Sequence, residues 1–187
     1  KYFTYPDGTP VETINDRNRY WGVSMWGHFG FSNFSDGRRY ATFLTSFFPA
    51  GGDKKSYGGD MQSLGRIAQD ALYYHEGKTA PIPQDLPDYV HFMKVSAGIR
   101  KTGPWVVSLS GLIAPAFSFN NFFLDRQGNF SVFNKKTGLI ISGANSKHQP
   151  ELATFNETRD KGKNTTYMPI SSHLQMDGNP DRLALAY

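Results

Sequence analysis

The 187-residue sequence contains no cysteine, and this absence removes a whole class of chemistry. Disulfide bonds, thiolate nucleophiles and zinc sites built on cysteine are excluded, because each of them needs a thiol. The longest apolar runs also fall far short of the roughly 20 residues that a membrane-spanning helix needs. Neither the histidines nor the Asp177–Asp181 turn has the spacing of a metal site. We therefore expect no membrane partner, no metal and no cofactor.

Dense clusters of charge are also lacking, although the net charge is +4. The basic residues are scattered and at most paired. The four densest pairs are Arg38-Arg39, Lys54-Lys55, Arg100-Lys101 and Lys135-Lys136. A nucleic-acid-binding protein usually carries a denser basic stripe or a known motif. The sequence thus predicts no nucleic-acid partner, while the positive balance mildly favours an anionic one.

Helical periodicity is present in the first third of the chain. From Asp36 onward, apolar residues recur at helical spacing, which predicts a helix with one buried face. They are Tyr40, Phe43, Leu44, Phe47 and Phe48. We expect Ser35 or Asp36 to cap this helix and Pro49 to end it. A second helix is predicted over 60–75. Its apolar stripe is Met61, Leu64, Ile67, Ala68, Ala71 and Leu72. Residues 1–77 are therefore assigned to a helical region.

The pattern changes after a proline-rich linker over 78–90, in which Pro81, Pro83 and Pro87 favour an extended path. Beyond it, apolar residues follow the two-residue period of β-strands. Strands are predicted at 105–109, 121–124, 129–133, 139–142 and 181–187, with turns at 125–128 and 134–138. Residues 156–166 are predicted to form a polar surface loop. We expect 91–187 to be an antiparallel β domain, so the fold class is α+β with helices first.

One short span near the start gathers the side chains that sugar chemistry uses. Tyrosine and histidine can transfer protons, and arginine and asparagine can bind a carboxylate. Tryptophan can stack on a sugar ring. The predicted catalytic residues are Tyr20 and His28, which would share one face if the span is helical. The predicted substrate-binding residues are Arg17, Asn18, Arg19, Trp21, Trp26 and Arg38.

Each of these residues also has a structural interpretation. Trp21 and Trp26 can belong to the core, because large aromatic residues dominate protein cores. His28 can be a half-buried residue with only its polar tip in water. Glu12 can cap a helix or pair with a cation instead of acting in catalysis. The sequence alone leaves both interpretations open.

The Pro6-Asp7-Gly8 turn, followed by Glu12 and then Tyr20, resembles a motif of heparinase II/III-like polysaccharide lyases. The segment 96–100, which precedes a strand, resembles the start of the β-sandwich in that family. The resemblance implies the last helices of an α/α toroid and the first strands of an antiparallel β-sandwich. The spacing from Glu12 to Tyr20 is longer than in the family motif, and the paired histidines of the family's sandwich are absent after His91.

The resemblance further implies a function. We expect a polysaccharide lyase, or a fragment of one, that binds an acidic, uronate-containing polysaccharide and cleaves it by β-elimination. Such an enzyme is expected outside the cytoplasm of a bacterium, in the periplasm or secreted. Because the motif lies at the edge of the chain, another chain is a candidate for completing the fold. The alternatives are a non-catalytic carbohydrate-binding module and a structural or assembly module.

Overall fold

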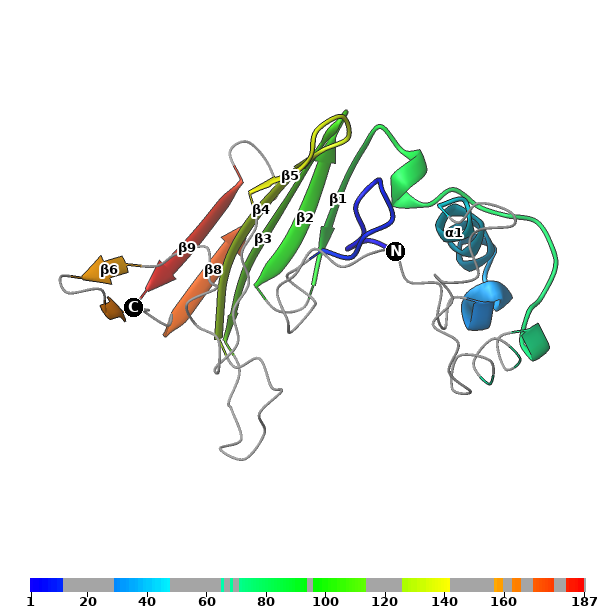
Figure 1. The fold of residues 1–187 in the computed structure, drawn as a ribbon, viewed down its shortest axis with the longest axis horizontal. Coiled ribbons are helices and arrows are strands. Elements are labelled where there is room, and N and C mark those ends of the chain that lie inside the picture. The colour runs from blue at the N-terminus through cyan, green and yellow to red at the C-terminus, as the bar shows by residue number, and fades with distance from the viewer. Residues whose placement is uncertain are drawn as a thin grey trace. The chain divides into compact units, whose positions relative to one another are not determined.

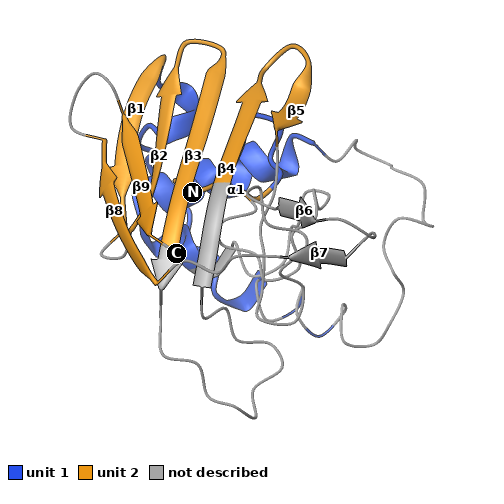
Figure 2. Ribbon diagram, turned by 90° about the vertical axis from the view of Figure 1, so that its left-hand side faces the viewer, with its two compact units in different colours: residues 1, 6–9, 22–86 blue, residues 2–5, 10–21, 87–187 orange. Residues whose placement is uncertain are grey.

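The structure is a computed structural model. The residues it describes are 1–11, 29–47, 65, 68, 71–93, 96–113, 126–141, 157–159, 163–165, 170–176 and 181–186. They belong to two compact units, shown in Figure 2. Unit 1 comprises residues 1, 6–9 and 22–86, and unit 2 comprises residues 2–5, 10–21 and 87–187. A helix precedes antiparallel sheets along the chain, so the predicted α+β class is confirmed.

Helix α1 of unit 1 spans Ser35–Thr45 and follows a short 3-10 helix, η2, at Phe29–Asn33. Its N-cap is Phe34, whose apolar side chain cannot accept a hydrogen bond, so the predicted Ser35 or Asp36 cap is wrong. At Gly37, α1 packs so closely on η2 that a Cβ would overlap the Phe31 carbonyl, so the position requires glycine.

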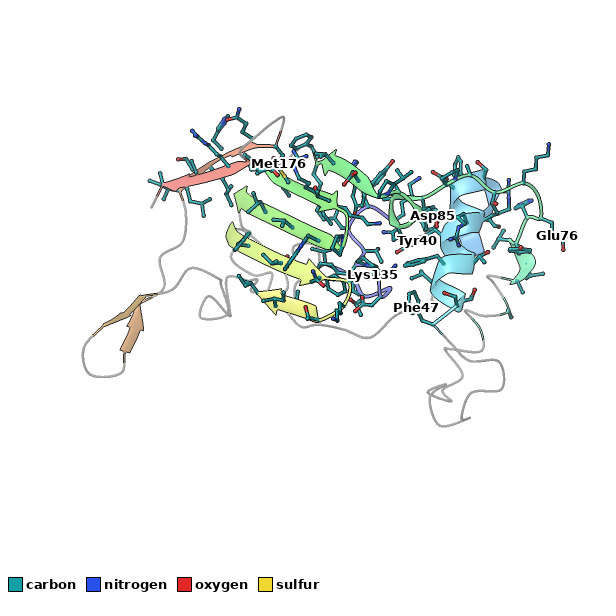
Figure 3. The ribbon with its side chains drawn as sticks, turned by 90° about the horizontal axis from the view of Figure 1, so that it is seen from above. Tyr40, Phe47, Glu76, Asp85, Lys135 and Met176 are labelled. Carbon is teal, nitrogen blue, oxygen red and sulfur yellow. The ribbon has the colours of Figure 1, made fainter. Side chains whose placement is uncertain are left out.

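The buried face of α1 also differs from the prediction. It consists of Gly37, Ala41 and Leu44, so Leu44 alone is buried among the described members of the predicted stripe, while Phe48 lies outside the described residues. The Phe43 ring lies 6.2 Å from that of Tyr40 and 5.1 Å from that of Phe47, and Phe47 remains 38% exposed. Figure 3 labels Tyr40 on this helix and Phe47 just after its end. Small residues on the buried side allow close packing, while the aromatic rings contact one another at the border with solvent.

The second predicted helix is described only in part. Residues 65, 68, 71 and 72 are helical, within the predicted range 60–75. The described members of its apolar stripe are not buried: Ala68 and Ala71 are exposed, and Leu72 is 83% exposed. An apolar stripe is buried only where another element packs on it. Among the residues that the structure describes, none covers this face.

Unit 2 is built on a five-stranded antiparallel sheet in which neighbours along the chain are neighbours in space (Figure 1). Its strands are β1 (Asp88–Phe92), β2 (Ala97–Thr102), β3 (Trp105–Ile113), β4 (Arg126–Asn134) and β5 (Gly138–Ile141). The strands predicted at 105–109 and 129–133 lie within β3 and β4, and β5 matches the described part of the one predicted at 139–142. The strand predicted at 121–124 lies outside the described residues.

Several predicted loops are wrong. Residues 126–128, predicted as part of a turn, belong to β4, where Gly128 pairs with Gly111 and Arg126 with Ile113. Pairing with β3 thus outweighs the local turn preference of the segment. Strand β1 begins within the predicted linker, after a 3-10 helix, η3, at Pro83–Asp85. The predicted loop 156–166 contains a small hairpin of β6 (Glu157–Arg159) and β7 (Lys163–Thr165).

Another hairpin joins β8 (Ser171–Gln175) and β9 (Arg182–Ala186), which confirms the strand predicted near 181–187. It lies against the five-stranded sheet. A Cβ at Gly98 would be 2.5 Å from the Met176 sulfur, and one at Gly111 would be 2.7 Å from the Ser172 Cβ. Figure 3 labels Met176 next to this part of the sheet. The two glycines thus leave the space that the hairpin occupies.

The core of unit 2 lies on the opposite face of the sheet, beneath a short N-terminal hairpin. In this hairpin the Val11 N–H donates to the Phe3 carbonyl at 3.1 Å, and Thr4 pairs with Pro10. The hairpin and the sheet contribute three buried side chains each to one cluster. These are Phe3, Tyr5, Val11, Ile99, Val106 and Phe133. Residues 2–5 thus pack with the β unit, although the sequence assigned them to a helical region.

In the part of the chain that the structure describes, no helix is long and apolar enough to cross a membrane.

Candidate functional site

Seven of the eight predicted site residues lie outside the residues that the structure describes. They are Arg17, Asn18, Arg19, Tyr20, Trp21, Trp26 and His28. Their roles in catalysis and substrate binding therefore stay predictions. The eighth, Arg38, is described.

Arg38 is held by backbone carbonyls. Its Nε and Nη2 donate to the Lys78 carbonyl at 3.0 and 2.6 Å, and its Nη1 donates to the Ser32 carbonyl. A planar guanidinium with five N–H groups suits such a site, because it can satisfy several acceptors at once. Arg38 thus connects α1 with two other segments of unit 1, and its role in substrate binding stays a prediction.

The Pro6-Asp7-Gly8 part of the motif forms a tight turn. One Asp7 carboxylate oxygen accepts from the Thr9 N–H at 3.0 Å and from the Thr9 hydroxyl at 2.6 Å. Gly8 has φ 84°, a left-handed conformation that glycine adopts without steric cost. Side-chain acceptors of this kind commonly stabilise turns. The turn lies between Tyr5 and Val11, which are both fully buried, and Glu12 is the next residue along the chain.

An aromatic cluster on strand β1 was not predicted from the sequence. The Tyr2 ring stacks on the His91 ring, with centroids 3.8 Å apart and planes 6° from parallel. Phe3 meets the same imidazole edge-on at 6.0 Å. The Tyr89 hydroxyl donates to the Tyr2 carbonyl at 2.9 Å, which positions the N-terminal strand over β1. Tyr2 remains 36% exposed, so one partner of the His91 stack reaches solvent.

The side chains of His91 and Tyr89 suit different chemical roles within this cluster. Imidazole is the usual proton-transfer side chain at neutral pH. Burial raises the pKa of Tyr89 above its ordinary value, so its phenol stays protonated. Tyr89 therefore acts as a hydrogen-bond donor, whereas His91 is the imidazole of this cluster.

A row of polar residues lies beneath the N-terminal hairpin and is closed to solvent. Ser108, Ser110 and Ser131 are fully buried, and Lys101 is 8% exposed. The Tyr5 hydroxyl donates to the Ser131 hydroxyl at 2.9 Å, and the Ser108 hydroxyl donates to the Gly98 carbonyl at 3.3 Å. Buried polar groups of this kind must be paired to avoid a desolvation penalty. We assign this row to the core.

Two sequence signals could have revealed the cluster on β1. The segment 88–92 contains Tyr89, Val90 and Phe92, which are aromatic or β-branched residues that favour strands, and Phe3 and Tyr5 alternate with Thr4 before the turn. Both segments are short and flanked by proline, which favours a loop interpretation. The contact between Tyr2 and His91 joins distant parts of the chain and leaves no local signature.

Among the described residues, no group of three or more histidine, aspartate or glutamate side chains could hold a metal ion.

Comparison with known proteins found no relative. The chain matches no protein-family model, no curated protein and no solved structure.

Proposed function

We propose that the protein binds an acidic, uronate-containing polysaccharide and cleaves it by β-elimination. The observation that carries this proposal is the Pro6-Asp7-Gly8 turn. It is a well-formed turn whose hairpin is packed on the sheet through Tyr5 and Val11, and the segment with Tyr20 and His28 follows directly. The part of the motif that is described thus has a defined structure, as a functional motif requires.

The order and layering of the elements also support the resemblance. Helix α1 precedes the antiparallel sheet, and the β8–β9 hairpin lies on the sheet face opposite the N-terminal hairpin. We infer that the five-stranded sheet is the first layer of a β-sandwich and that β8–β9 begins the second layer. Unit 1 would then correspond to the last helices of an α/α toroid.

The reaction needs three groups. Arg17, Asn18 and Arg19 would bind the uronate carboxylate and stabilise the charge that develops on it. A base, Tyr20 or His28, would remove the proton from the carbon next to the carboxylate. The electron pair left behind forms a carbon–carbon double bond as the glycosidic oxygen departs, and that oxygen takes a proton from Tyr20 or His28 acting as the acid. His91 is a further described side chain with the chemistry for this proton transfer.

The double bond formed in the product absorbs ultraviolet light, which gives a direct assay with a panel of uronate polysaccharides. We expect Tyr20→Phe and His28→Gln to lower kcat by at least about 100-fold, the usual contribution of acid–base catalysis. Tyr73→Phe is the matched control, because Tyr73 is 58% exposed and has no proposed role. The proposal fails if no uronate polymer gives product, or if Tyr20→Phe and Tyr73→Phe are equally active.

A further inference from the structure

Three turns of the chain are joined at one end of the five-stranded sheet. The Gly103 N–H donates to the Pro87 carbonyl at 3.0 Å and to the Asp88 carboxylate at 3.1 Å. The Lys135 N–H donates to the Pro104 carbonyl at 2.8 Å. The turn that carries Lys135 is itself held by the Asn134 side chain, which accepts from the Lys136 N–H at 2.9 Å. These bonds order the backbone before any partner arrives, which lowers the entropic cost of binding.

This end of the sheet exposes one large aromatic side chain beside two cations. Trp105 is 46% exposed, and Lys135 and Lys136 are exposed. Trp105 lies directly opposite Asn134 in the β3–β4 register, so its Cα is about 5 Å from that of Asn134. Lys135 is the next residue along the chain and is labelled at this end of the sheet in Figure 3. We call Trp105, Lys135 and Lys136 the turn-end patch.

The charge of the turn-end patch favours an anionic ligand. Among the residues that the structure describes, Asp88 contributes a carboxylate that is bonded to these turns, and one of its oxygens accepts from the Gly103 backbone N–H. Two lysines against one carboxylate leave a positive excess. The Trp105 ring lies on the opposite face of the sheet from its neighbour Val106, which is buried in the core. The ring is thus available to a ligand from outside.

We propose that the turn-end patch is a second, non-catalytic binding site for the same acidic polysaccharide. Trp105 stacks on one sugar ring, and Lys135 and Lys136 pair with carboxylates of neighbouring sugars. The choice of ligand rests on the proposed function, but the patch contains none of the proposed catalytic residues. When one polymer chain occupies both sites, the second binding event is intramolecular, so the overall affinity exceeds that of either site alone. A weak second site therefore increases the retention of long chains.

The observations favour a glycan over a nucleic acid. One aromatic ring beside two lysines suits a polysaccharide whose negative charges are widely spaced along the chain. Nucleic-acid surfaces usually have a denser basic stripe with several stacking residues. A neutral glycan would contact the ring but would gain nothing from the lysines. Because an acidic glycan pairs with the lysines, its binding is expected to weaken as the salt concentration rises.

The test measures binding of polyuronate to the full chain by isothermal titration calorimetry. We expect Trp105→Ala to weaken polymer binding about tenfold, as the loss of one aromatic stacking contact implies. The double variant Lys135→Gln/Lys136→Gln is expected to weaken binding about threefold and to reduce its salt dependence. Trp105→Phe should retain part of the affinity, and circular dichroism checks that each variant is folded. Lys78→Gln, which removes an exposed lysine of unit 1, should bind as the unmodified chain does.

Turnover of a short oligouronate separates this proposal from the proposed function. Trp105→Ala should turn over the short substrate normally while binding the polymer more weakly. Unchanged polymer binding in Trp105→Ala, or an equal loss in Lys78→Gln, would overturn the turn-end patch even if the chain is an active lyase. Tighter binding of a single-stranded oligonucleotide than of polyuronate would also overturn it. If the short substrate gives no product while polymer binding depends on Trp105, the lyase proposal fails and the patch stands.

Discussion

The sheet of unit 2 is held together by buried side chains from distant parts of the chain, whereas the described part of unit 1 relies heavily on polar contacts. In unit 2, the cluster around Tyr5 and Phe133 consists of six residues that are each at most 5% exposed. In unit 1, the guanidinium of Arg38 binds two carbonyls, and Arg39 forms an ion pair with Asp85 (labelled in Figure 3). The Ser32 hydroxyl donates a hydrogen bond to the Tyr73 carbonyl at 3.2 Å and accepts one from the His75 N–H at 2.8 Å.

This difference has energetic consequences. Burial of apolar surface contributes about 25 cal/mol per Å². A hydrogen bond contributes only about 1 kcal/mol net, and an exposed ion pair contributes less. Loss of one buried ring should therefore harm unit 2 more than loss of any single polar contact harms unit 1.

The largest effect is expected for Phe133→Ala. Phe133 is 2% exposed and stacks on Tyr5 with centroids 4.7 Å apart. Its truncation leaves a cavity beneath the N-terminal hairpin and should lower the free energy of unfolding of unit 2 by about 3–5 kcal/mol. Urea unfolding, with hydrogen exchange followed by mass spectrometry to localise the loss, provides the measurement. Ile140→Ala is the control, because Ile140 is 53% exposed and its truncation should cost under about 0.5 kcal/mol. Equal losses in the two variants would contradict the role assigned to the buried cluster.

A smaller effect is expected for Arg38→Met in unit 1. The substitution keeps an apolar stem but removes the donor to the partly buried Ser32 contact and to the exposed Lys78 carbonyl, which should cost about 1–1.5 kcal/mol. Hydrogen exchange should increase in peptides covering 35–45 while β2 and β3 are unchanged. Arg39→Met is the matched control from the same helix, because it breaks only a partly exposed ion pair, worth under about 1 kcal/mol. A greater loss for Arg39→Met would show that charge, not carbonyl binding, stabilises α1.

The Arg100–Asp181 pair is a polar contact within unit 2, which is held together mainly by buried apolar side chains. Its removal therefore shows how much a polar contact contributes in that unit. Arg100 Nε and Nη2 donate to the two Asp181 oxygens at 2.5 and 2.8 Å, and Nη2 also donates to the Met176 carbonyl. The hydrogen bond to Asp181 raises the pKa of Arg100, which stays a cation. We expect Arg100→Gln to cost about 1 kcal/mol and to increase exchange in β8 and β9 alone. A double-mutant cycle with Asp181→Asn isolates the interaction energy of the pair. A coupling energy near zero would contradict the claim that the pair stabilises the fold.

The sequence predicts the elements that depend on local pattern. The parts of β3 and β4 at 105–109 and 129–133 follow from β-branched and alternating residues, and the turn between β4 and β5 follows from Asn134 and Gly138, which has φ 82°. The Pro6-Asp7-Gly8 turn is local in the same sense. Each of these features is decided by the residues that form it, so a single sequence is sufficient to predict it.

Features that depend on distant partners were not predicted. Leu72 belongs to a good helical stripe and is exposed, whereas Gly37 and Ala41 form the buried face of α1 with little apolar signal. The packing of Tyr5 on Phe133 and the stacking of Tyr2 on His91 each need a sheet that the local sequence does not specify. Tertiary contacts outweigh local preference at these positions.

The smallest expected effect concerns Tyr89, where burial acts on a titrating group. Because burial raises the pKa of Tyr89 in the folded protein, folding favours the protonated phenol. The resulting stability is fully present below the unfolded pKa of about 10 and is lost as pH rises toward the folded pKa. Tyr89→Phe cannot ionise, so it should lose less stability than the unmodified chain above about pH 10. Near pH 7, it should lose only its hydrogen bond to the Tyr2 carbonyl, under about 1 kcal/mol. Urea unfolding at both pH values measures the difference, and parallel pH dependence in the two proteins would show that Tyr89 ionises as easily in the folded chain as in the unfolded one.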